Sequence, residues 1–537
     1  MLSDSASLIL STKSTVNPAV FGAPVGGVTT KNSFTFNNID LKNVMGEMWD
    51  KYDQFALKLI SFSTDGSVTL SNSVDGLITY NLRGLEWSNL IYETTGSINN
   101  KEWVPVAYAI LSSGNPVVNP LIINTGWSFN FKKNSRIVDL EFAIGTGSAF
   151  GASEFGVPRA GSSYNDVEFH FLFEPVIPGK MNECAFYGFN ASATLTGAIK
   201  RDVSTDRTIY SYPDFDIRNL CKFFWDKHDN FEIQMAMISL RGPGTNAGDI
   251  RLVPVQMSGL NFVNNGTKQS NATSGLVLNT ENAIIGTLAL PTSGTTYSVD
   301  LAYPVAPVQF KKDRDNVALT IAFRNSENTA SSNAAGLTAA GMPNFQIGFF
   351  IKPIYEVEKA SLYINPWGLT TTETNLGVRD TSYTTFTLKN IDLRQVCRSM
   401  WDKYDRFNIF LTTVSWHIGV GNVTNSAFII QMEGFDFINQ LSLTASNRQT
   451  QVATIGSFYG SPTPATDVRS SGTMACGVTT FLKTKDIVDL TLTAIPLGTT
   501  AFSAMTPLTG NFKFTIVGVP KDEEQSKQLT QNWMPVI

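Results

Sequence analysis

One stretch of this 537-residue chain occurs three times, and it constrains the fold more than any other feature. It reads IDLKNVMGEMWDKYDQF from Ile39 to Phe55, FDIRNLCKFFWDKHDNF from Phe215 to Phe231 and IDLRQVCRSMWDKYDRF from Ile391 to Phe407. The tryptophans of successive copies, at 49, 225 and 401, are 176 residues apart each time. That period is the size of a whole domain and too long for a solenoid repeat. The sequence therefore predicts three tandem copies of one domain, with bounds 1–180, 181–357 and 358–537.

The repeated stretch predicts a helix that leads into a strand. An aspartate opens each copy in the N-cap position, where its carboxylate accepts from the first backbone N–H groups. Apolar residues then recur with helical spacing over about three turns, and from Phe55 the period changes to two. We expect this helix to pack on a sheet. The expected core of the repeat consists of Asp40, Trp49, Tyr52, Phe55, Asp216, Trp225, His228, Phe231, Asp392, Trp401, Tyr404 and Phe407.

Further blocks recur around the helix and define the fold class. Each copy opens with a short apolar strand, at 6–10, 185–187 and 360–364, and closes with a stronger one, at 169–173, 345–350 and 512–516. A glycine-containing block begins at 82, 257 and 432, and a charged turn begins at 131, 310 and 481. These blocks give seven or eight strands and one helix per copy. We expect an all-β chain of three tandem jelly-roll-like β-sandwich domains that form a pseudo-threefold unit. An immunoglobulin-like sandwich is less favoured, because it spans only about 100 residues.

Composition and cysteine usage exclude several classes of protein. A net charge of −5 gives no basis for a nucleic-acid partner, which requires a basic domain or stripe. No apolar run reaches the roughly 18 residues of a membrane span, and the first residues lack the basic start of a secretory signal. We therefore expect a soluble protein. Four cysteines, Cys184, Cys221, Cys397 and Cys476, form no disulfide framework; Cys221 and Cys397 occupy the same helix position and are expected in the core of a protein made in a reducing compartment.

Catalytic signatures are missing from the sequence. The three histidines, His170, His228 and His417, are far apart, and no phosphate-binding loop, dinucleotide fingerprint, Gly-x-Ser-x-Gly or Cys-x-x-Cys occurs. The Asp-Lys-Tyr/His-Asp run is an alternative site for catalysis or metal binding. Three copies of one active site in one chain would be unusual, so we interpret this run as structural. The lysines at 132–133 and 311–312 are interpreted as solvated turns. We expect no enzyme activity, cofactor or metal.

Tryptophans outside the repeated stretch are the candidates for contacts. Trp87 aligns with Phe262 and Phe437 and is expected in the core. The remaining candidates have no counterpart in the other copies or lie in the polar tail that follows Pro520, and large apolar side chains of this kind anchor interfaces. The candidate interface residues are Trp103, Trp127, Trp533, Met534 and Ile537.

Over its whole length, the predicted architecture resembles the jelly-roll minor capsid and cement proteins of large icosahedral double-stranded DNA viruses. The resemblance implies a virion protein, assembled in the host cytoplasm or nucleus, that bridges or supports major capsid capsomers. Its partners would be those capsomers and neighbouring minor capsid proteins. The chain departs from that lineage in domain number, since its major capsid proteins usually carry two jelly rolls.

The three copies keep their core residues at constant offsets while their loops diverge, which suits a symmetric scaffold that makes asymmetric contacts with its neighbours. We expect the loops at 145–161 and 329–341 and the tail to make those contacts. The alternatives are a carbohydrate-binding adhesin or fibre head, with a glycan bound beside exposed aromatics, and a major capsid protein.

Overall fold

We refer to residues 1–180, 181–357 and 358–537 as the first, second and third repeats. In the computed structural model the structure is described for residues 5–12, 14–21, 33–64, 76–93, 103–111, 128–146, 167–177, 183–191, 200–203, 207–241, 252–268, 277–278, 282–289, 298–300, 307–324, 344–354, 358–364, 374–376, 384–419, 426–438, 442–443, 448–449, 452–460, 467–472, 479–497 and 509–519. Strands dominate these residues, and they form several antiparallel sheets packed as sandwiches. The predicted all-β, multi-domain sandwich class is confirmed.

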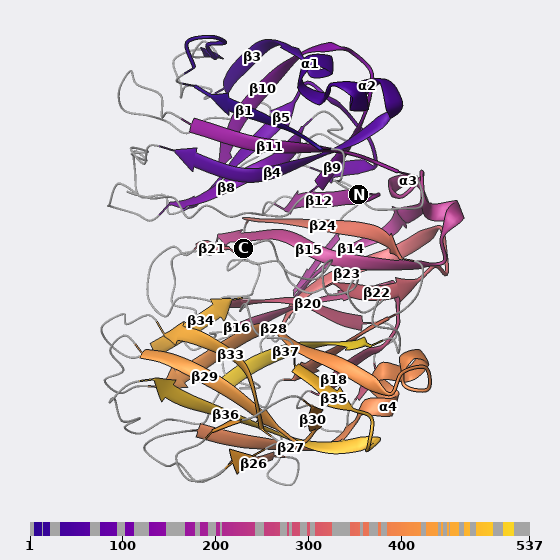
Figure 1. Ribbon diagram of the computed structural model, residues 1–537, viewed down its shortest axis with the longest axis vertical. Coiled ribbons are helices and arrows are strands. Elements are labelled where there is room, and N and C mark those ends of the chain that lie inside the picture. Colours follow the sequence, from indigo (N-terminus) through magenta and orange to yellow (C-terminus); the bar gives the residue numbers. More distant parts are fainter. Residues whose placement is uncertain are drawn as a thin grey trace.

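Two five-stranded sheets make up the first repeat (Figure 1). In order across the sheet, one consists of β1 (Ala6–Ser11), β11 (Val167–Pro175), β4 (Gln54–Thr64), β9 (Ser128–Lys132) and β6 (Glu86–Trp87). The other consists of β2 (Val20–Phe21), β3 (Ser33–Asp40), β10 (Ile137–Thr146), β5 (Gly76–Arg83) and β8 (Val104–Leu111). The opening strand β1 thus lies beside the closing strand β11, which is the longest-range pairing of the repeat.

The second repeat has the same arrangement. Its first sheet runs β17 (Asn261–Phe262), β22 (Val308–Lys311), β15 (Asn230–Arg241), β24 (Asn344–Ile354) and β12 (Ala185–Ala191), and β21 (Ser298–Asp300) also pairs with β15. Its second sheet runs β13 (Lys200–Val203), β14 (Arg207–Asp216), β23 (Asn316–Arg324), β16 (Leu252–Ser258) and β20 (Asn282–Ala289).

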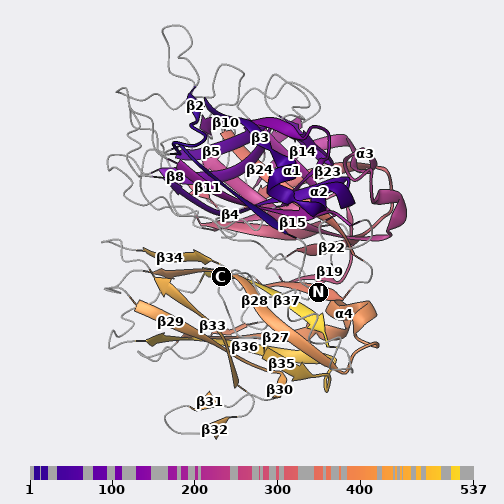
Figure 2. The ribbon, with the colours of Figure 1, turned by 45° about the horizontal axis from the view of Figure 1, so that its top comes forward.

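In the third repeat the first sheet runs β25 (Lys359–Ile364), β37 (Thr509–Gly518), β28 (Arg406–Gly419), β35 (Thr479–Leu482) and β30 (Asp436–Ile438), and β34 (Asp467–Gly472) also pairs with β28. The second runs β26 (Thr374–Leu376), β27 (Thr384–Asp392), β36 (Ile487–Leu497), β29 (Ser426–Glu433) and β33 (Val452–Gly460). A two-stranded hairpin of β31 (Ser442–Leu443) and β32 (Arg448–Gln449) follows β30 and lies at the outer end of the third repeat, close to β33 (Figure 2).

The predicted three-turn helix is in the expected place but is broken. It divides into α1 (Leu41–Met45) and α2 (Glu47–Lys51), into α3 (Ile217–Leu220) and a 3₁₀ turn at Trp225–Lys227, and into α4 (Leu393–Cys397) and a 3₁₀ turn at Arg398–Met400. The break falls at Gly46 with φ 56° and at Arg398 with φ 28°. A left-handed residue cannot continue a right-handed helix, so the prediction of one continuous helix was wrong. The break redirects the chain so that the tryptophan still packs inward.

Each repeat encloses its own hydrophobic core between its two sheets. In the first repeat the centre is a group of phenylalanine rings, in which Phe142 stacks on Phe169 at 4.5 Å between centroids and Phe169 on Phe171 at 5.7 Å. These rings alternate with outward-facing residues along β11, as expected for a strand with one buried face. Among the described residues, no helix is long and apolar enough to cross a membrane.

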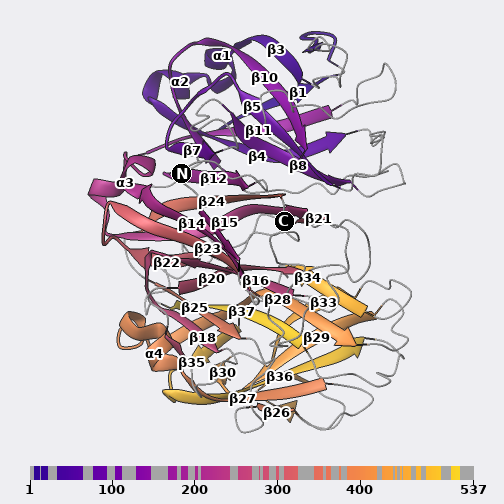
Figure 3. The same cartoon turned by 180° about the vertical axis from the view of Figure 1, so that it is seen from behind.

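The three repeats follow one another along the long axis of the molecule. Figure 1 shows the first repeat (indigo) at the top, the second (magenta) in the middle and the third (orange to yellow) at the bottom, and Figure 3 shows the same order from behind. The first and third repeats therefore lie at opposite ends of the molecule, and the expected pseudo-threefold unit is not observed, because the repeats form a linear stack.

Candidate assembly interface

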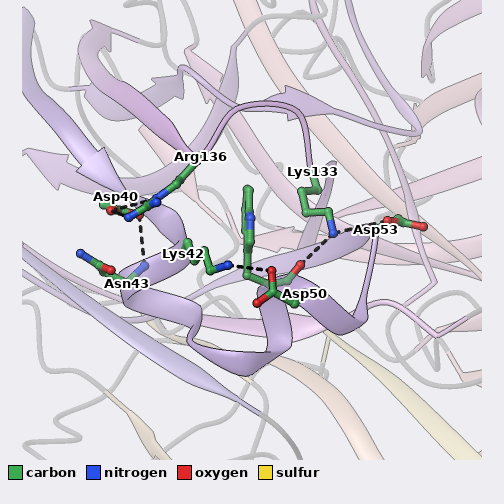
Figure 4. A network of polar contacts seen from close by, with 8 residues as sticks. Asp40, Lys42, Asn43, Asp50, Asp53, Lys133 and Arg136 are labelled. Carbon is green, nitrogen blue, oxygen red and sulfur yellow. Dashed lines mark hydrogen bonds and ion pairs between the residues drawn. The ribbon is translucent and has the colours of Figure 1, made fainter.

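The Asp-Lys-Tyr/His-Asp run belongs to a polar network at the helix ends (Figure 4). Asp40 caps α1 by accepting from the backbone N–H of Asn43, and Asp216 and Asp392 cap α3 and α4 in the same way. The aspartate that follows each tryptophan pairs with a basic residue eight positions earlier in the chain. These pairs are Lys42–Asp50 at 2.9 Å, Arg218–Asp226 at 2.9 Å and Arg394–Asp402 at 3.7 Å. In each repeat, an ion pair thus links the first helical segment to the aspartate that follows the tryptophan.

A lysine from the charged turn closes each network from the other side. Lys133 donates to the backbone carbonyl of Trp49 at 2.7 Å, pairs with Asp53 at 3.5 Å and lies over the indole ring. Lys312 and Lys483 make the same three contacts in the second and third repeats. The interpretation of this turn as merely solvated was therefore wrong for its second lysine, because the helix end leaves a carbonyl that needs a donor.

The tryptophans pack inward in all three repeats, but the polar residue beside the indole differs in the first repeat. Trp225 and Trp401 are nearly inaccessible and stack on the phenylalanine at the second position of the next strand, with centroids 4.8 and 5.1 Å apart. Their indole N–H groups donate to Asp315 and Asp486, both at 2.8 Å. The corresponding residue of the first repeat is Arg136, which pairs with Asp40 instead.

Neighbouring groups lower the pKa of two carboxyl groups in these networks. Asp315 has a pKa below its ordinary value, chiefly because it accepts from the Trp225 indole and secondarily because Arg218 is near. The Arg136 guanidinium likewise holds the pKa of Asp40 below its ordinary value. All of these carboxylates have protein partners. Within the described ranges there is no group of three His, Cys, Asp or Glu side chains placed to hold a metal. The network therefore stabilises a fold element.

The contacts between repeats are the second feature that recurs, and the sequence did not reveal it. After β6, the chain leaves the sandwich of the first repeat and forms β7 (Leu90–Glu93), which pairs in parallel with β12 of the second repeat. After β17, the chain likewise forms β18 (Asn265–Lys268), which pairs in parallel with β25 of the third repeat. The first and second repeats thus each add one strand to the first sheet of the next repeat.

An asparagine sets the turn at each crossing. Asn89 and Asn264 have positive φ angles of 55° and 49°, a conformation that asparagine tolerates better than most residues. The Asn89 carbonyl accepts from the N–H of Phe186 at 2.9 Å, and the Asn264 carbonyl accepts from the N–H of Ser361 at 2.8 Å. The sequence signal that could have revealed the crossing is the asparagine itself, which follows the aromatic residue of each block by two positions and recurs at 439.

Apolar packing fills the first junction. Phe186 on β12 lies 5.3 Å from Phe129 of the first repeat and 5.2 Å from Phe350 of the second, between ring centroids. Beside this cluster, the Cys184 thiol donates to the Ser128 carbonyl across the junction at 2.9 Å. Burial raises the pKa of this thiol to about 11, so it is protonated and unreactive at neutral pH.

Buried charge characterises the second junction. Lys359 on β25 pairs with Glu232 on β15 at 2.9 Å, with only 19% and 13% of the side chains exposed. Burial acts to raise the pKa of Glu232, but the charges of Lys359 and Lys352 outweigh it, so the pKa lies below its ordinary value. On the same sheet, Lys513 is 2% exposed, and burial lowers its pKa to about 7. The two junctions share a backbone geometry but differ in side-chain chemistry.

The remaining predicted residues are placed as follows. Tyr52 is half-buried against the first core, Tyr404 is buried and donates to Glu358 at 3.3 Å, and His228 is buried 3.9 Å from Glu183. Trp87 and Trp103 are each 9% exposed. Trp103 also lies under the Arg83 guanidinium, so it presents little surface to a partner. Trp127, Trp533, Met534, Ile537, Cys476 and the loops at 147–161 and 329–341 lie outside the described residues.

Comparisons with known proteins find no matching family model and no matching curated relative. Among solved structures, the chain is weakly similar to the CBM22-1–CBM22-2 tandem domain of Paenibacillus barcinonensis Xyn10C, with 10% identity, 61% of this chain and 93% of the other covered, and a TM-score of 0.15. It is also weakly similar to the Sputnik virophage, with 8% identity, 64% and 86% covered and a TM-score of 0.15. For infectious bursal virus-derived T=1 particles, the values are 10%, 66% and 82%, and 0.08. The β-rich neighbours thus include capsids and a carbohydrate-binding module, at scores too low to support an argument.

Proposed function

We propose that this chain is a structural protein of a virus, a minor capsid or cement component that bridges or supports capsomers without catalysing a reaction. The main support for this proposal is the order of the strands within the two sheets. If the eight main strands of the first repeat are numbered along the chain, its sheets run 1-8-3-6 and 2-7-4-5. We infer that each repeat is a jelly roll, the sandwich of many viral capsid domains.

The junctions between repeats support a scaffold role. Strand addition joins both pairs of successive repeats through the backbone, and a largely buried ion pair adds a side-chain contact at the second junction. The loops expected to make contacts are at 145–161 and 329–341, and the tail follows Pro520. We propose that these loops and the tail contact the major capsomers and neighbouring minor capsid proteins within the virion.

The adhesin alternative finds less support. A glycan site needs exposed aromatic rings, whereas the large hydrophobic side chains that are exposed in the described part of the chain are aliphatic: Ile9, Val16, Val20, Ile137 and Ile487. Trp103, its described candidate, is covered by Arg83. A major capsid protein remains a second capsid assignment, and it predicts that the purified chain forms closed shells by itself.

Deletion of residues 533–537 tests the proposal. We expect the truncated chain to be incorporated poorly into particles while its melting temperature stays within about 1 °C of the full chain, because the last few residues of a chain usually contribute little to the stability of a domain. Particle incorporation is measured by quantitative mass spectrometry after co-expression with the other virion proteins, and replacement of the five residues by a Gly/Ser sequence of equal length is the control. Normal incorporation of the truncated chain would contradict the role of the tail, and shell formation by the chain alone would favour the major capsid assignment.

A further inference from the structure

The opening strand of the first repeat has an outer edge that no described strand covers, unlike the opening strands of the other two repeats. On β12 and β25, the outer edge is covered by a parallel strand from the preceding repeat. The strand β1 stands at the end of its sheet, and among the described residues only β11 pairs with it. Among the described residues, no strand fills the place beside β1 that β7 and β18 fill beside β12 and β25.

Side-chain exposure shows the same difference. Ser7 corresponds to Phe186 and Ser361, which are 2% and 5% exposed, whereas Ser7 is exposed. Ile9 corresponds to Tyr363, and their exposed fractions are 60% and 1%. The residues that a neighbouring repeat buries elsewhere in the molecule therefore lie in solvent on β1.

The third repeat carries the complementary strand. β31 follows β30 as β18 follows β17, and its residues Ser442 and Leu443 align with Thr267 and Lys268. β18 pairs on one edge with β19 (Val277–Leu278) and on the other with β25. β31 pairs on one edge with β32, and within the described ranges no other strand forms a ladder with it, although β33 lies close by. Figure 2 shows the β31–β32 hairpin projecting at the end of the molecule away from the first repeat.

The open edge of β1 lacks the features by which proteins prevent strand addition. Exposed edge strands usually carry a charged residue, a proline or a bulge that blocks pairing. The sequence of β1 is Ala-Ser-Leu-Ile-Leu-Ser, its pairing with β11 has no register shift, and Ile9 is exposed on it. By contrast, the edge strands β6 and β30 carry Glu86 and Asp436. The edge of β1 is suited to accept a strand.

We propose that β1 is the acceptor for β31 of a second copy of this chain, so that copies associate head to tail through the same parallel strand addition that joins the repeats. Continuity with the two internal junctions fixes the register: Ser442 of one copy lies beside Ile9 of the next, as Thr267 lies beside Tyr363. Such a contact joins different surfaces, so it generates an open filament, or a ring if the rotation closes. This inference is independent of the proposed capsid role, because it concerns the chain alone.

A proline at position 7 tests the acceptor edge. Phe186 and Ser361 donate their N–H groups to the carbonyls of Asn89 and Asn264, each of which directly precedes the added strand, so by equivalence the Ser7 N–H faces the open edge and is not part of the ladder with β11. Ser7→Pro removes that donor, while Ser7→Ala retains it and is the matched control. We expect wild type and Ser7→Ala to show sedimentation coefficients that rise with protein concentration. The association constant of Ser7→Pro should be lower by a factor of about ten or more. All three should share one melting temperature, because proline is tolerated where the N–H faces outward from an edge.

A mixed cross-link tests the register. One preparation carries Ile9→Cys and the other Ser442→Cys; after mixing and mild oxidation, a disulfide-linked dimer should form in the mixture but in neither preparation alone. Ile9→Cys mixed with Val16→Cys is the control, since Val16 is exposed and lies outside β1. The proposal is overturned if wild type stays monomeric at all concentrations, if Ser7→Pro associates like wild type, or if the control mixture cross-links as well as the test mixture. These self-association experiments do not depend on the tail-deletion experiment, so the result of one does not decide the other.

Discussion

At the scale of single residues, glycine at three equivalent positions is required by close contact. Gly84, Gly259 and Gly434 have φ angles of 114°, 102° and 117°, and a Cβ on any of them would lie 2.0–2.2 Å from a carbonyl oxygen of the neighbouring strand. The sequence allowed a bulge or tight strand entry to be predicted here from the glycine alone. It could not show which backbone atom crowds the position, because that atom is about 55 residues away in the chain.

We expect Gly259→Ala to destabilise the protein by more than 2 kcal/mol, since it combines a left-handed backbone with a backbone clash. Gly46→Ala is the matched control: Gly46 also has a positive φ, but nothing lies within 4 Å of its Cβ position, so a cost of about 1 kcal/mol is expected. Urea denaturation of both variants measures the difference. Equal costs would show that backbone conformation alone, without the clash, explains the glycine.

Lys513 gives a second prediction at this scale. Its pKa is lowered to about 7 in the folded protein and is near 10.4 in the unfolded chain, so between these values the unfolded state binds more protons. The stability should therefore rise with pH from about 7 to 10, by as much as about 1.4 kcal/mol per unit. Lys513→Met should be more stable than wild type at pH 7 and should lose most of this slope in denaturation measured across the range. An unchanged slope would exclude Lys513 as its source.

At the scale of secondary-structure elements, the helix was predictable in position but not in continuity. The N-cap aspartates and the apolar stripe are visible as a pattern, and the structure places both where the sequence indicated. The break is not visible, because Arg398 adopts its positive φ under tertiary packing and has no preference for it. The strand crossings were missed for a related reason: β7 and β18 are short, and their partners belong to the next repeat.

The capping bonds can be tested separately from the charges around them. Asp216→Ala should destabilise the second repeat by about 1 kcal/mol, because it removes the acceptor for the backbone N–H of Asn219, which lies 2.8 Å from the carboxylate. Asp216→Asn should recover most of this loss, since asparagine caps helices about as well as aspartate. Thermal unfolding followed by circular dichroism compares the three proteins. Loss in both variants alike would indicate that the charge of Asp216, and not its cap, matters.

At the scale of the whole molecule, the second junction contains one largely buried ion pair in addition to its strand pairing. Lys359→Met leaves Glu232 without its partner, which should destabilise the protein by up to about 3 kcal/mol at pH 7, whereas the double variant Lys359→Met/Glu232→Gln should recover most of that. Because the pKa of Glu232 is lowered in the folded state, the pair stabilises above the ordinary glutamate pKa and is lost as the pH falls through the native value. Acid denaturation curves of the three proteins test both expectations. Coincident curves would show that the junction does not need the pair.

The order of donor and acceptor strands along the chain has a consequence for synthesis on the ribosome. At both junctions the donor residue precedes its acceptor by 96 residues, as Leu90 precedes Phe186 and Asn265 precedes Ser361. At 5–20 residues per second, the donor is therefore made roughly 5–20 seconds before the strand that it covers. The nascent second and third repeats each emerge beside a partner that is already available, and neither has to wait with an uncovered apolar edge.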